Sequence, residues 1–448
     1  MDLRTPSRTP SIERIVQSRD WFGLRKALRN WPAPDIADLL FNLSEHDRVL
    51  VFRSLPRQVA AKVASELDSD SVDALLKGLT DEETRAVLTS LKPDDRTSLL
   101  EEMPGQLTQR LLNLLSPEDL KETRHLLGYP EGSVGRLMTP DYVAVRSGWT
   151  VEQALDHIRK KGKDSETIST IYVVDGEWKL LDALDVKQLI LADPSEPVKS
   201  LMDYSCASLS AFDDREKAVL ATQKHDLFVV PVVDSEGVLL GIVTADDILD
   251  VAQEEVTEDF HRTAAVSPLD DHYTETSIWE LYSKRIGWLV ALVLLNLVSS
   301  SVMAVFEKTL ASTIALAFFI PLLIDSGGNA GSQSATLMIR ALATGNLKMR
   351  HWTQTVTREL IVGVSLGLTM GVAAWLLGLF RGGFHVGLIV GLSMASIVMV
   401  ANLIGTGLPF LLTRFGVDPA VASSPLITTV ADAAGLVIYF SLARVILG

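Results

Sequence analysis

Residues 321–336 read PLLIDSGGNAGSQSAT and lie inside an apolar stretch over residues 314–339. Such polar groups are unusual in a membrane helix, because inside the bilayer they must be satisfied by protein or water rather than by lipid. Their carbonyl and amide oxygens suit a small hydrated cation. A helix-packing face of small residues would explain the glycines but not Asp325, Asn329 and Gln333 together. We therefore expect this run to face a cavity.

Four further apolar stretches accompany this one, and each reaches the roughly 20 residues that cross a bilayer as a helix. The five stretches are Ile286–Phe306, Ile314–Ile339, Leu360–Phe380, Val386–Leu412 and Val421–Leu447. Lys and Arg gather before the first stretch and between the second and third, so the positive-inside rule places the N-terminal half in the cytoplasm. We predict a polytopic all-α membrane domain of five helices over residues 285–448, with the C-terminus outside.

The last apolar stretch contains a single acid, Asp432. An ionised side chain at that depth costs at least about 2.5–3.5 kcal/mol, so intramembrane acids are usually functional. Thr428 lies four residues before Asp432, which puts both oxygens on one helix face. We interpret this pair as a cation site, and a protonated Asp432 bonded to a neighbouring helix is the alternative. Asn402 adds a polar group to the fourth stretch, where helix packing would explain it equally well.

The acidic residues concentrate in the other half of the chain. The formal net charge is −15, yet the residues from Ile286 onward hold 8 Lys and Arg against 5 Asp and Glu. Nucleic-acid binding needs a basic face that neutralises phosphates, so this composition argues against it. Cationic partners fit the acidic half better.

A twelve-residue repeat organises residues 1–130. Its apolar positions are Leu43, Leu55, Leu67, Leu79, Leu91, Met103 and Leu115. Most are followed by Ser, Thr, Pro or acids, which are typical of helix starts. Twelve residues leave about two and a half turns per helix, too short to bury an apolar face alone. The pattern favours an α-solenoid, with an ordinary helical bundle as the alternative.

A longer α+β unit occurs twice in residues 131–252. Each copy has the order β-α-β-β-α, and the strands ending in Val-Val-Asp at Asp175 and Asp234 lie 59 residues apart. Two such units in register resemble a tandem CBS domain pair, a family that senses adenosine nucleotides or cations. In the second copy Thr244 and Asp247 match the ribose-contacting T-x-x-D motif of that family, whereas the first copy has Gln188 at the second position. The resemblance implies one nucleotide half-site, which makes ATP a candidate ligand.

An acidic helix is predicted over residues 253–284, between the CBS pair and the membrane. At about 100° per residue, Asp247, Asp250, Glu254 and Glu258 fall within an arc of roughly 80°. Like charges at this spacing repel one another, and multivalent cations would cancel the repulsion. A solvated acidic face is the alternative reading of the same pattern.

In this order, the helical repeat, CBS pair, acidic helix and five spans resemble the MgtE family of magnesium channels over nearly the whole chain. The signatures are YPEGSVGRLMTP at 129–140, GGNAGSQS at 327–334, GVDPA at 416–420, and Asp432. The resemblance implies a homodimer with its pore on the two-fold axis, where Asp432 of both subunits holds hydrated Mg2+. It also implies backbone ligands near Gly328, Asn329 and Thr428. Asp325 departs from the Gly or Ser expected there.

The resemblance further implies gating by intracellular Mg2+ bound between the acidic cytosolic parts. Carried over by position, the sensor residues are Asp94, Asp95, Glu216, Asp226, Asp247, Asp250, Glu255, Glu258 and Asp259, with Asp418 at the cytoplasmic mouth. We therefore expect a Mg2+-selective channel for magnesium uptake in the plasma membrane, and not an enzyme. A Na+- or H+-coupled divalent-cation transporter is the alternative, and a membrane-anchored CBS sensor would leave Asp432 unexplained.

Overall fold

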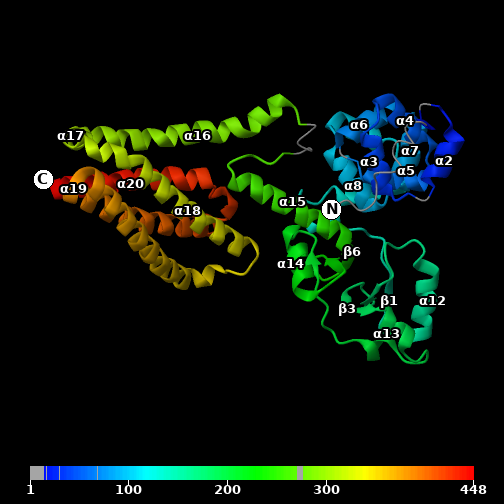
Figure 1. Ribbon diagram of the computed structural model, residues 1–448. Helices are drawn as coiled ribbons and strands as arrows, with labels where there is room; N and C mark the ends of the chain where they lie inside the picture. Colours follow the sequence, from blue (N-terminus) through cyan, green and yellow to red (C-terminus); the bar gives the residue numbers. More distant parts are fainter. Residues whose placement is uncertain (1–14, 17, 30, 68, 270–275, 448) are drawn as a thin grey trace. The chain divides into compact units, whose positions relative to one another are not determined.

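The computed structural model describes residues 15–447 apart from residues 17, 30, 68 and 270–275. The chain forms two units, Met1–Gln253 and Glu254–Gly448. The first unit contains a helical repeat followed by two small sheets, and the second consists of helices (Figure 1).

Short helices build the N-terminal part of the first unit. They are α2 (Trp21–Leu28), α3 (Ala33–Phe41), α4 (Glu45–Ser54), α5 (Arg57–Ser65), α6 (Ser69–Gly78), α7 (Asp81–Ser90), α8 (Pro93–Glu102), α9 (Gly105–Leu112), α10 (Pro117–Leu126) and α11 (Val134–Leu137). From α4 to α10 every helix begins twelve residues after the one before. The hydroxyls of Ser44, Thr80 and Ser116 cap α4, α7 and α10 by accepting bonds from backbone N–H groups. The predicted helical repeat is therefore confirmed.

Two three-stranded sheets follow, one for each copy of the α+β unit. The first copy contains β1 (Ala144–Arg146), α12 (Val151–Lys161), β2 (Thr170–Val174), β3 (Leu180–Asp185), α13 (Val186–Leu191) and η1 (Val198–Leu201). The second contains β4 (Leu209–Ser210), α14 (Glu216–His225), β5 (Val229–Val233), β6 (Leu239–Thr244) and α15 (Ala245–Thr263). In each sheet the middle strand pairs parallel to the first strand and antiparallel to the last. The two copies thus share one topology, as predicted.

The acidic helix differs from its predicted bounds of 253–284. It is the C-terminal part of α15, which starts inside the second α+β copy and ends at Thr263. Ala265 then takes a left-handed conformation with φ 58°, and the N–H of Val266 bonds back to the carbonyl of His261. Residues 278–284 belong instead to the first long apolar helix.

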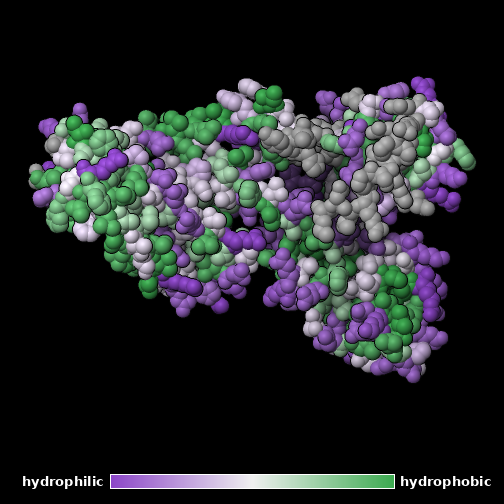
Figure 2. Space-filling model, viewed as in Figure 1, coloured by the Kyte–Doolittle hydropathy of each residue, from purple (hydrophilic) through white to green (hydrophobic). Residues whose placement is uncertain are grey.

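Long apolar helices make up most of the second unit. Its elements are α16 (Ile278–Val305), α17 (Glu307–Ser312), η2 (Ile314–Phe319), α18 (Ile320–Ala343), η3 (Met349–His351), α19 (Trp352–Arg414), η4 (Pro419–Val421) and α20 (Ser424–Leu447). Among the described residues, four helical segments are long and apolar enough to cross a membrane. Figure 2 shows apolar side chains along α16, where Leu289, Val293 and Leu297 are more than half exposed.

The 63 residues of α19 are two helices joined by a reversal of the chain. A straight helix of that length would measure about 95 Å, three times the apolar thickness of a bilayer. Gly383 interrupts it with φ 77° and ψ −173°, a conformation open to glycine. A Cβ on Gly378 would lie 2.7 Å from Cα of Gly387, and one on Gly371 would lie 2.9 Å from the carbonyl oxygen of Gly391. The two halves therefore pack antiparallel, and the four long segments contain five membrane-crossing lengths.

Candidate cation sites

The first candidate site lies where α18 packs against α20. Asp432 is half-buried on α20, and Thr428 lies one turn before it. A Cβ on Gly328 of α18 would lie 3.0 Å from Cγ2 of Thr428 and 3.7 Å from a carboxylate oxygen of Asp432. The hydroxyl of Thr428 donates to the carbonyl of Pro425 at 2.9 Å, which leaves its lone pairs available. The structure thus brings together three of the residues that the sequence singled out.

Two further predicted residues lie beside this site on the exposed face of α18. The side-chain amide of Asn329 donates to a carboxylate oxygen of Asp325 at 3.2 Å. Asp325 is close enough to Asp432 for their charges to interact. The site therefore contains two carboxylates, with the amide held against one of them. Multiple carboxylates and neutral oxygens favour a divalent cation over a monovalent one.

The GGNAGSQS run does not present all its polar groups to this site. The hydroxyl of Ser334 lies 2.8 Å from that of Thr406 and 3.3 Å from a carboxylate oxygen of Glu359. Asn402, whose role the sequence left open, donates to the carbonyl and the carboxylate of Glu359 at 2.8 and 3.1 Å. Asn402 thus ties the two halves of α19 together. Sequence reasoning missed Glu359, because it lies one residue before the predicted start of its span.

A second group of acids lies in the first unit, where the helical repeat meets the second α+β copy. Asp94 in the first turn of α8 is only 6% exposed, and its Oδ1 has no hydrogen-bond partner among the described residues. Burial, Asp247, Asp95 and Glu166 raise the pKa of Asp94 to about 8. Burial also raises the pKa of Asp247 to about 6, against a hydrogen bond from Thr244 that lowers it. We call Asp94, Asp95, Glu166 and Asp247 the buried acid cluster.

Sequence reasoning missed Glu166, which joins this cluster from the first α+β copy. It forms an ion pair with Lys92, the residue before α8. Burial raises the pKa of Asp95, and the negative charge of Glu166 raises it further against the opposing charge of Lys92. Asp250 is close enough to Glu66 to raise the pKa of that carboxyl. In the described part of the chain, the carboxylates of this region therefore outnumber Lys92 and Lys62, whose positive charges lower the pKa of Asp95.

The acids of the C-terminal part of α15 form a third group. Arg262 pairs with both Glu258 and Asp418. Burial raises the pKa of Asp259, and the charges of Asp418 and Glu255 raise it further. Asp418 also caps η4 by accepting a hydrogen bond from the N–H of Ala420 at 2.8 Å. Part of the predicted acidic arc is thus neutralised by an arginine of the same helix.

Two predicted sensor residues lie apart from the buried acid cluster. Glu216 begins α14, and Asp226 ends it in a left-handed conformation. Neither contributes to the shifted pKa of Asp94, Asp95 or Asp247. Asp226 instead lines a cavity of about 620 Å³ between the two α+β copies. The carboxylates that line this cavity are Asp182, Asp185, Asp203 and Asp226.

The predicted nucleotide half-site has a different local geometry. The hydroxyl of Thr244 donates to a carboxylate oxygen of Asp247 at 2.7 Å and also contacts Asp246. Thr244 is 7% exposed, and its hydroxyl already bonds to Asp247. The two side chains are therefore largely shielded from a ribose. A nucleotide would have more room in the 620 Å³ cavity, where its phosphates would meet carboxylates unless cations screened them.

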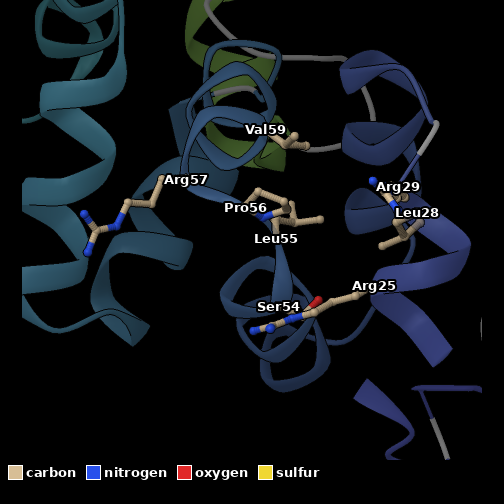
Figure 3. A pocket seen from close by; sticks show the side chains of 8 residues that line it. All are labelled: Arg25, Leu28, Arg29, Ser54, Leu55, Pro56, Arg57 and Val59. Carbon is tan, nitrogen blue, oxygen red and sulfur yellow. The ribbon is translucent and has the colours of Figure 1, made fainter. Parts of the chain in front are cut away.

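The side chains of the described residues limit where a cation can bind. Across the described part of the chain, no three His, Cys, Asp or Glu side chains lie close enough to ligate an ion directly. One cavity of about 470 Å³ in the helical repeat is lined by Arg25, Arg29 and Arg57 and by no carboxylate (Figure 3). It is unsuited to a cation. Contact through water, which Mg2+ retains readily, fits the site beside Asp432 and the buried acid cluster better.

Comparisons with known proteins agree with this architecture. Family models match successive parts of it: the MgtE intracellular N domain at residues 31–132, CBS domains at 134–194 and 198–254, and a divalent cation transporter domain at 320–442. The chain is 42% identical to the magnesium transporter MgtE of Thermus thermophilus, with 98% of both chains covered. It is 32% identical to that of Bacillus subtilis, covering 93% of this chain and 95% of the relative.

Solved structures resemble the first unit. One is the cytosolic domain of the Mg2+ channel MgtE in complex with ATP, 37% identical with a TM-score of 0.53, covering 54% of this chain and 99% of that chain. Another is the soluble part of a magnesium transporter, 25% identical with a TM-score of 0.52, covering 55% and 98%. The chain belongs to the MgtE family of magnesium transporters.

Proposed function

We propose that this transporter is a Mg2+-selective channel for magnesium uptake across the plasma membrane, with Asp432 as its selectivity site. The observation that carries the proposal is the close approach of α18 to α20, where Gly328, having no side chain, brings the backbone of α18 against Thr428 and beside Asp432. The site is built from oxygen groups alone, which are the ligands that Mg2+ prefers. Asp432 supplies the charge that offsets the partial loss of bulk solvation.

A homodimer would complete this site. One Asp432 provides a single negative charge, whereas two copies across a two-fold axis would balance a dication. Mg2+ releases its octahedral water shell reluctantly, so the carboxylates would contact those waters rather than the ion itself. The lone pairs of Thr428 and the amide of Asn329 would bind the same water shell. Asp325 would add negative charge at the edge of the pathway.

We propose that intracellular Mg2+ closes the channel by binding at the buried acid cluster and along α15. The unpartnered Oδ1 of Asp94 is a buried acceptor that a water of hydrated Mg2+ would satisfy. A bound dication would remove the repulsion that raises the pKa of Asp94 and Asp247. Glu255 and Asp259 would extend the sensor toward Asp418. Glu216 and Asp226, which lie apart from the cluster at opposite ends of α14, would belong to two separate and secondary sites.

ATP is a further candidate regulator, at the CBS pair. A structural relative is described as a complex with ATP. In this chain the cavity beside Asp226 is acidic, so ATP would bind there together with Mg2+ rather than as the free anion. Thr244 and Asp247 would have to exchange their mutual hydrogen bond for one to the ribose.

Flux into proteoliposomes tests the channel proposal against its alternative. Purified full-length protein is reconstituted, and Mg2+ entry is measured with no other gradient, with a sodium gradient, and with a proton gradient. A channel carries Mg2+ at the same rate in all three conditions. Entry that requires a sodium or proton gradient would identify a coupled transporter and refute the proposal.

A further inference from the structure

A cavity at one end of the membrane helices belongs to neither cation site. It has a volume of about 430 Å³ and lies between the C-terminal half of α18, the link that follows it, and both halves of α19. Its polar lining includes Gln333, Ser334, Glu359 and Asn402, together with Asn346, Thr355 and Arg358. Gly328 and Asp432 are absent from this wall. The cavity therefore needs an explanation of its own.

The polar wall offers hydrogen-bond acceptors that the protein leaves unused. Glu359 accepts bonds from Ser334 and Asn402 through Oε2 alone, and within the described part of the chain its Oε1 accepts none. Asn402 is 3% exposed and donates through Nδ2, which leaves its Oδ1 without a donor. The amide of Gln333 has no described partner. Three side-chain oxygens thus line one cavity in need of donors.

The charges of the wall are separated rather than paired. Glu359 forms no ion pair among the described residues, although Arg358 follows the same cavity wall. An unpaired carboxylate beside apolar surface is costly, which favours a cationic group next to it. Among the described residues Arg358 likewise forms no ion pair with a carboxylate. Its guanidinium group would bind phosphate well. The cavity is therefore complementary to a zwitterion with a cationic and an anionic end.

The rest of the cavity is apolar and open toward the outer face of the helices. Leu337, Val362 and Leu366 line it and are 62%, 40% and 41% exposed. They lie on helices that cross the membrane, so their exposed surface suits an acyl chain. Lys348 and Arg350 in the adjoining link add positive charge that attracts phosphate.

We propose that this cavity binds a phospholipid whose headgroup carries a primary ammonium, such as phosphatidylethanolamine. The three N–H groups of the ammonium match the oxygens of Glu359, Asn402 and Gln333 in number, and the phosphate lies at Arg358. A choline headgroup has no N–H and cannot make these bonds. A small cation would satisfy Glu359 but would leave the apolar wall and Arg358 unused.

Native mass spectrometry of the full-length protein in detergent tests the proposal. Equimolar phosphatidylethanolamine, phosphatidylcholine and phosphatidylglycerol with identical acyl chains are added, and lipid retention is compared. Loss of charge-assisted hydrogen bonds predicts about tenfold better retention of the ethanolamine lipid than of the choline lipid. In Glu359→Gln this ratio falls to about one. The control Glu307→Gln, an exposed acid in α17, keeps the wild-type ratio.

A second variant separates the two ends of the headgroup. Arg358→Gln lowers retention of the ethanolamine and choline lipids together, because both share the phosphate. Equal retention of these lipids by the wild type, or an unchanged preference in Glu359→Gln, would overturn the proposal. Preferred retention of phosphatidylglycerol would also overturn it, since only the phosphate would then be recognised. None of these readouts depends on Mg2+ transport.

Discussion

The backbone of α18 comes close to Thr428 because residue 328 has no side chain. A Cβ on Gly328 would lie 3.0 Å from Cγ2 of Thr428, which is tighter than most side-chain contacts, and 3.7 Å from the Asp432 carboxylate, which is an ordinary contact. The close approach of the two helices at the proposed selectivity site thus depends on a glycine of α18, and the negative charge there comes from Asp432 of α20.

Replacing Asp432 by Asn should abolish most divalent selectivity while leaving the fold intact. The amide still hydrogen-bonds water but no longer offsets the charge of the ion, and losing one such charged contact corresponds to roughly 10–100-fold. Asp432→Glu should also impair transport, because one methylene displaces the oxygens by more than the water shell tolerates. The measurement is the Mg2+ to Na+ permeability ratio in proteoliposomes. A wild-type permeability ratio in the Asn variant would mean that Asp432 is not the selectivity site, and Asp325 would become the candidate.

Asp94 should make the stability of the first unit depend on pH. Its folded-state pKa of about 8 lies above the ordinary value of 3.8, so between these values the folded chain binds more protons than the unfolded chain. Stability contributed by this group is therefore present at low pH and falls as pH rises from about 4 to 8. Asp94→Asn should therefore raise the free energy of local opening of α8 at pH 8 by about 1–3 kcal/mol, which is measured as slower hydrogen exchange.

The same variant should behave like the wild type below about pH 3, where Asp94 is protonated in both the folded and the unfolded chain. Added Mg2+ should slow exchange in the wild type at pH 8 and have less effect in Asp94→Asn. Asp81→Asn, at the exposed start of α7, is the matched control. Equal exchange of wild type and Asp94→Asn at pH 8 would show that the buried carboxylate carries no such cost.

Some residues of these sites were predictable from sequence and others were not. Asp432 and Thr428 stand out because a carboxylate inside an apolar stretch is costly. Glu166 and Glu359 carry no such local signal, since each acquires its role from a partner distant in the chain. Asp94 was predicted through family resemblance alone, because a first-turn acid usually serves only to stabilise its helix.

At the scale of elements, α15 connects the two units through one continuous helix. It begins directly after β6 in the second α+β copy and ends at Thr263 in the second unit. Its acids are divided between the two units: Asp247 belongs to the buried acid cluster, and Glu258 forms an ion pair with Arg262. We therefore expect cation binding at its start to be transmitted along the helix.

Neutralising the acids of α15 should leave a channel that no longer closes. We expect full-length protein carrying Asp247→Asn, Asp250→Asn, Glu255→Gln and Asp259→Asn to conduct at high internal Mg2+, because the neutral amides no longer bind the dication that closes the channel. In the wild type, millimolar Mg2+ should protect α15 from protease, and in the variant it should not. Unchanged closure together with unchanged protection would show that the acids of α15 form a solvated face and not a Mg2+ sensor.

The elements themselves were predicted unevenly. The twelve-residue repeat indicates helix starts closely, because capping residues and prolines recur with the apolar positions. The end of α15 was missed, since the left-handed position that terminates it is Ala265 rather than the glycine or asparagine usual there. The second span was predicted to begin at Ile314. Residues 314–319 form a 3-10 helix instead, and the α-helix begins at Ile320, next to Pro321.

For the whole molecule, the reversal at Gly383 decides which side of the membrane the C-terminus occupies. Counted as one crossing, α19 would give four spans and place both ends of the membrane domain on the same side. Counted as two antiparallel helices, it gives five spans and places them on opposite sides. The packing of Gly378 on Gly387 favours the second count.

Reporter fusions should therefore report opposite sides for the two ends of the membrane domain. With the N-terminal half in the cytoplasm, as the loop charges predict, alkaline phosphatase fused after Gly448 should be active, because that enzyme folds only in an oxidising compartment. A fusion within residues 344–348, between the second and third spans, should be inactive, and one at Gly383 should be active. Green fluorescent protein at the same three positions should give the reverse pattern. Cytoplasmic behaviour at Gly448 with an unchanged result at residues 344–348 would mean either that α19 crosses only once or that α20 does not cross, and would refute the count of five spans.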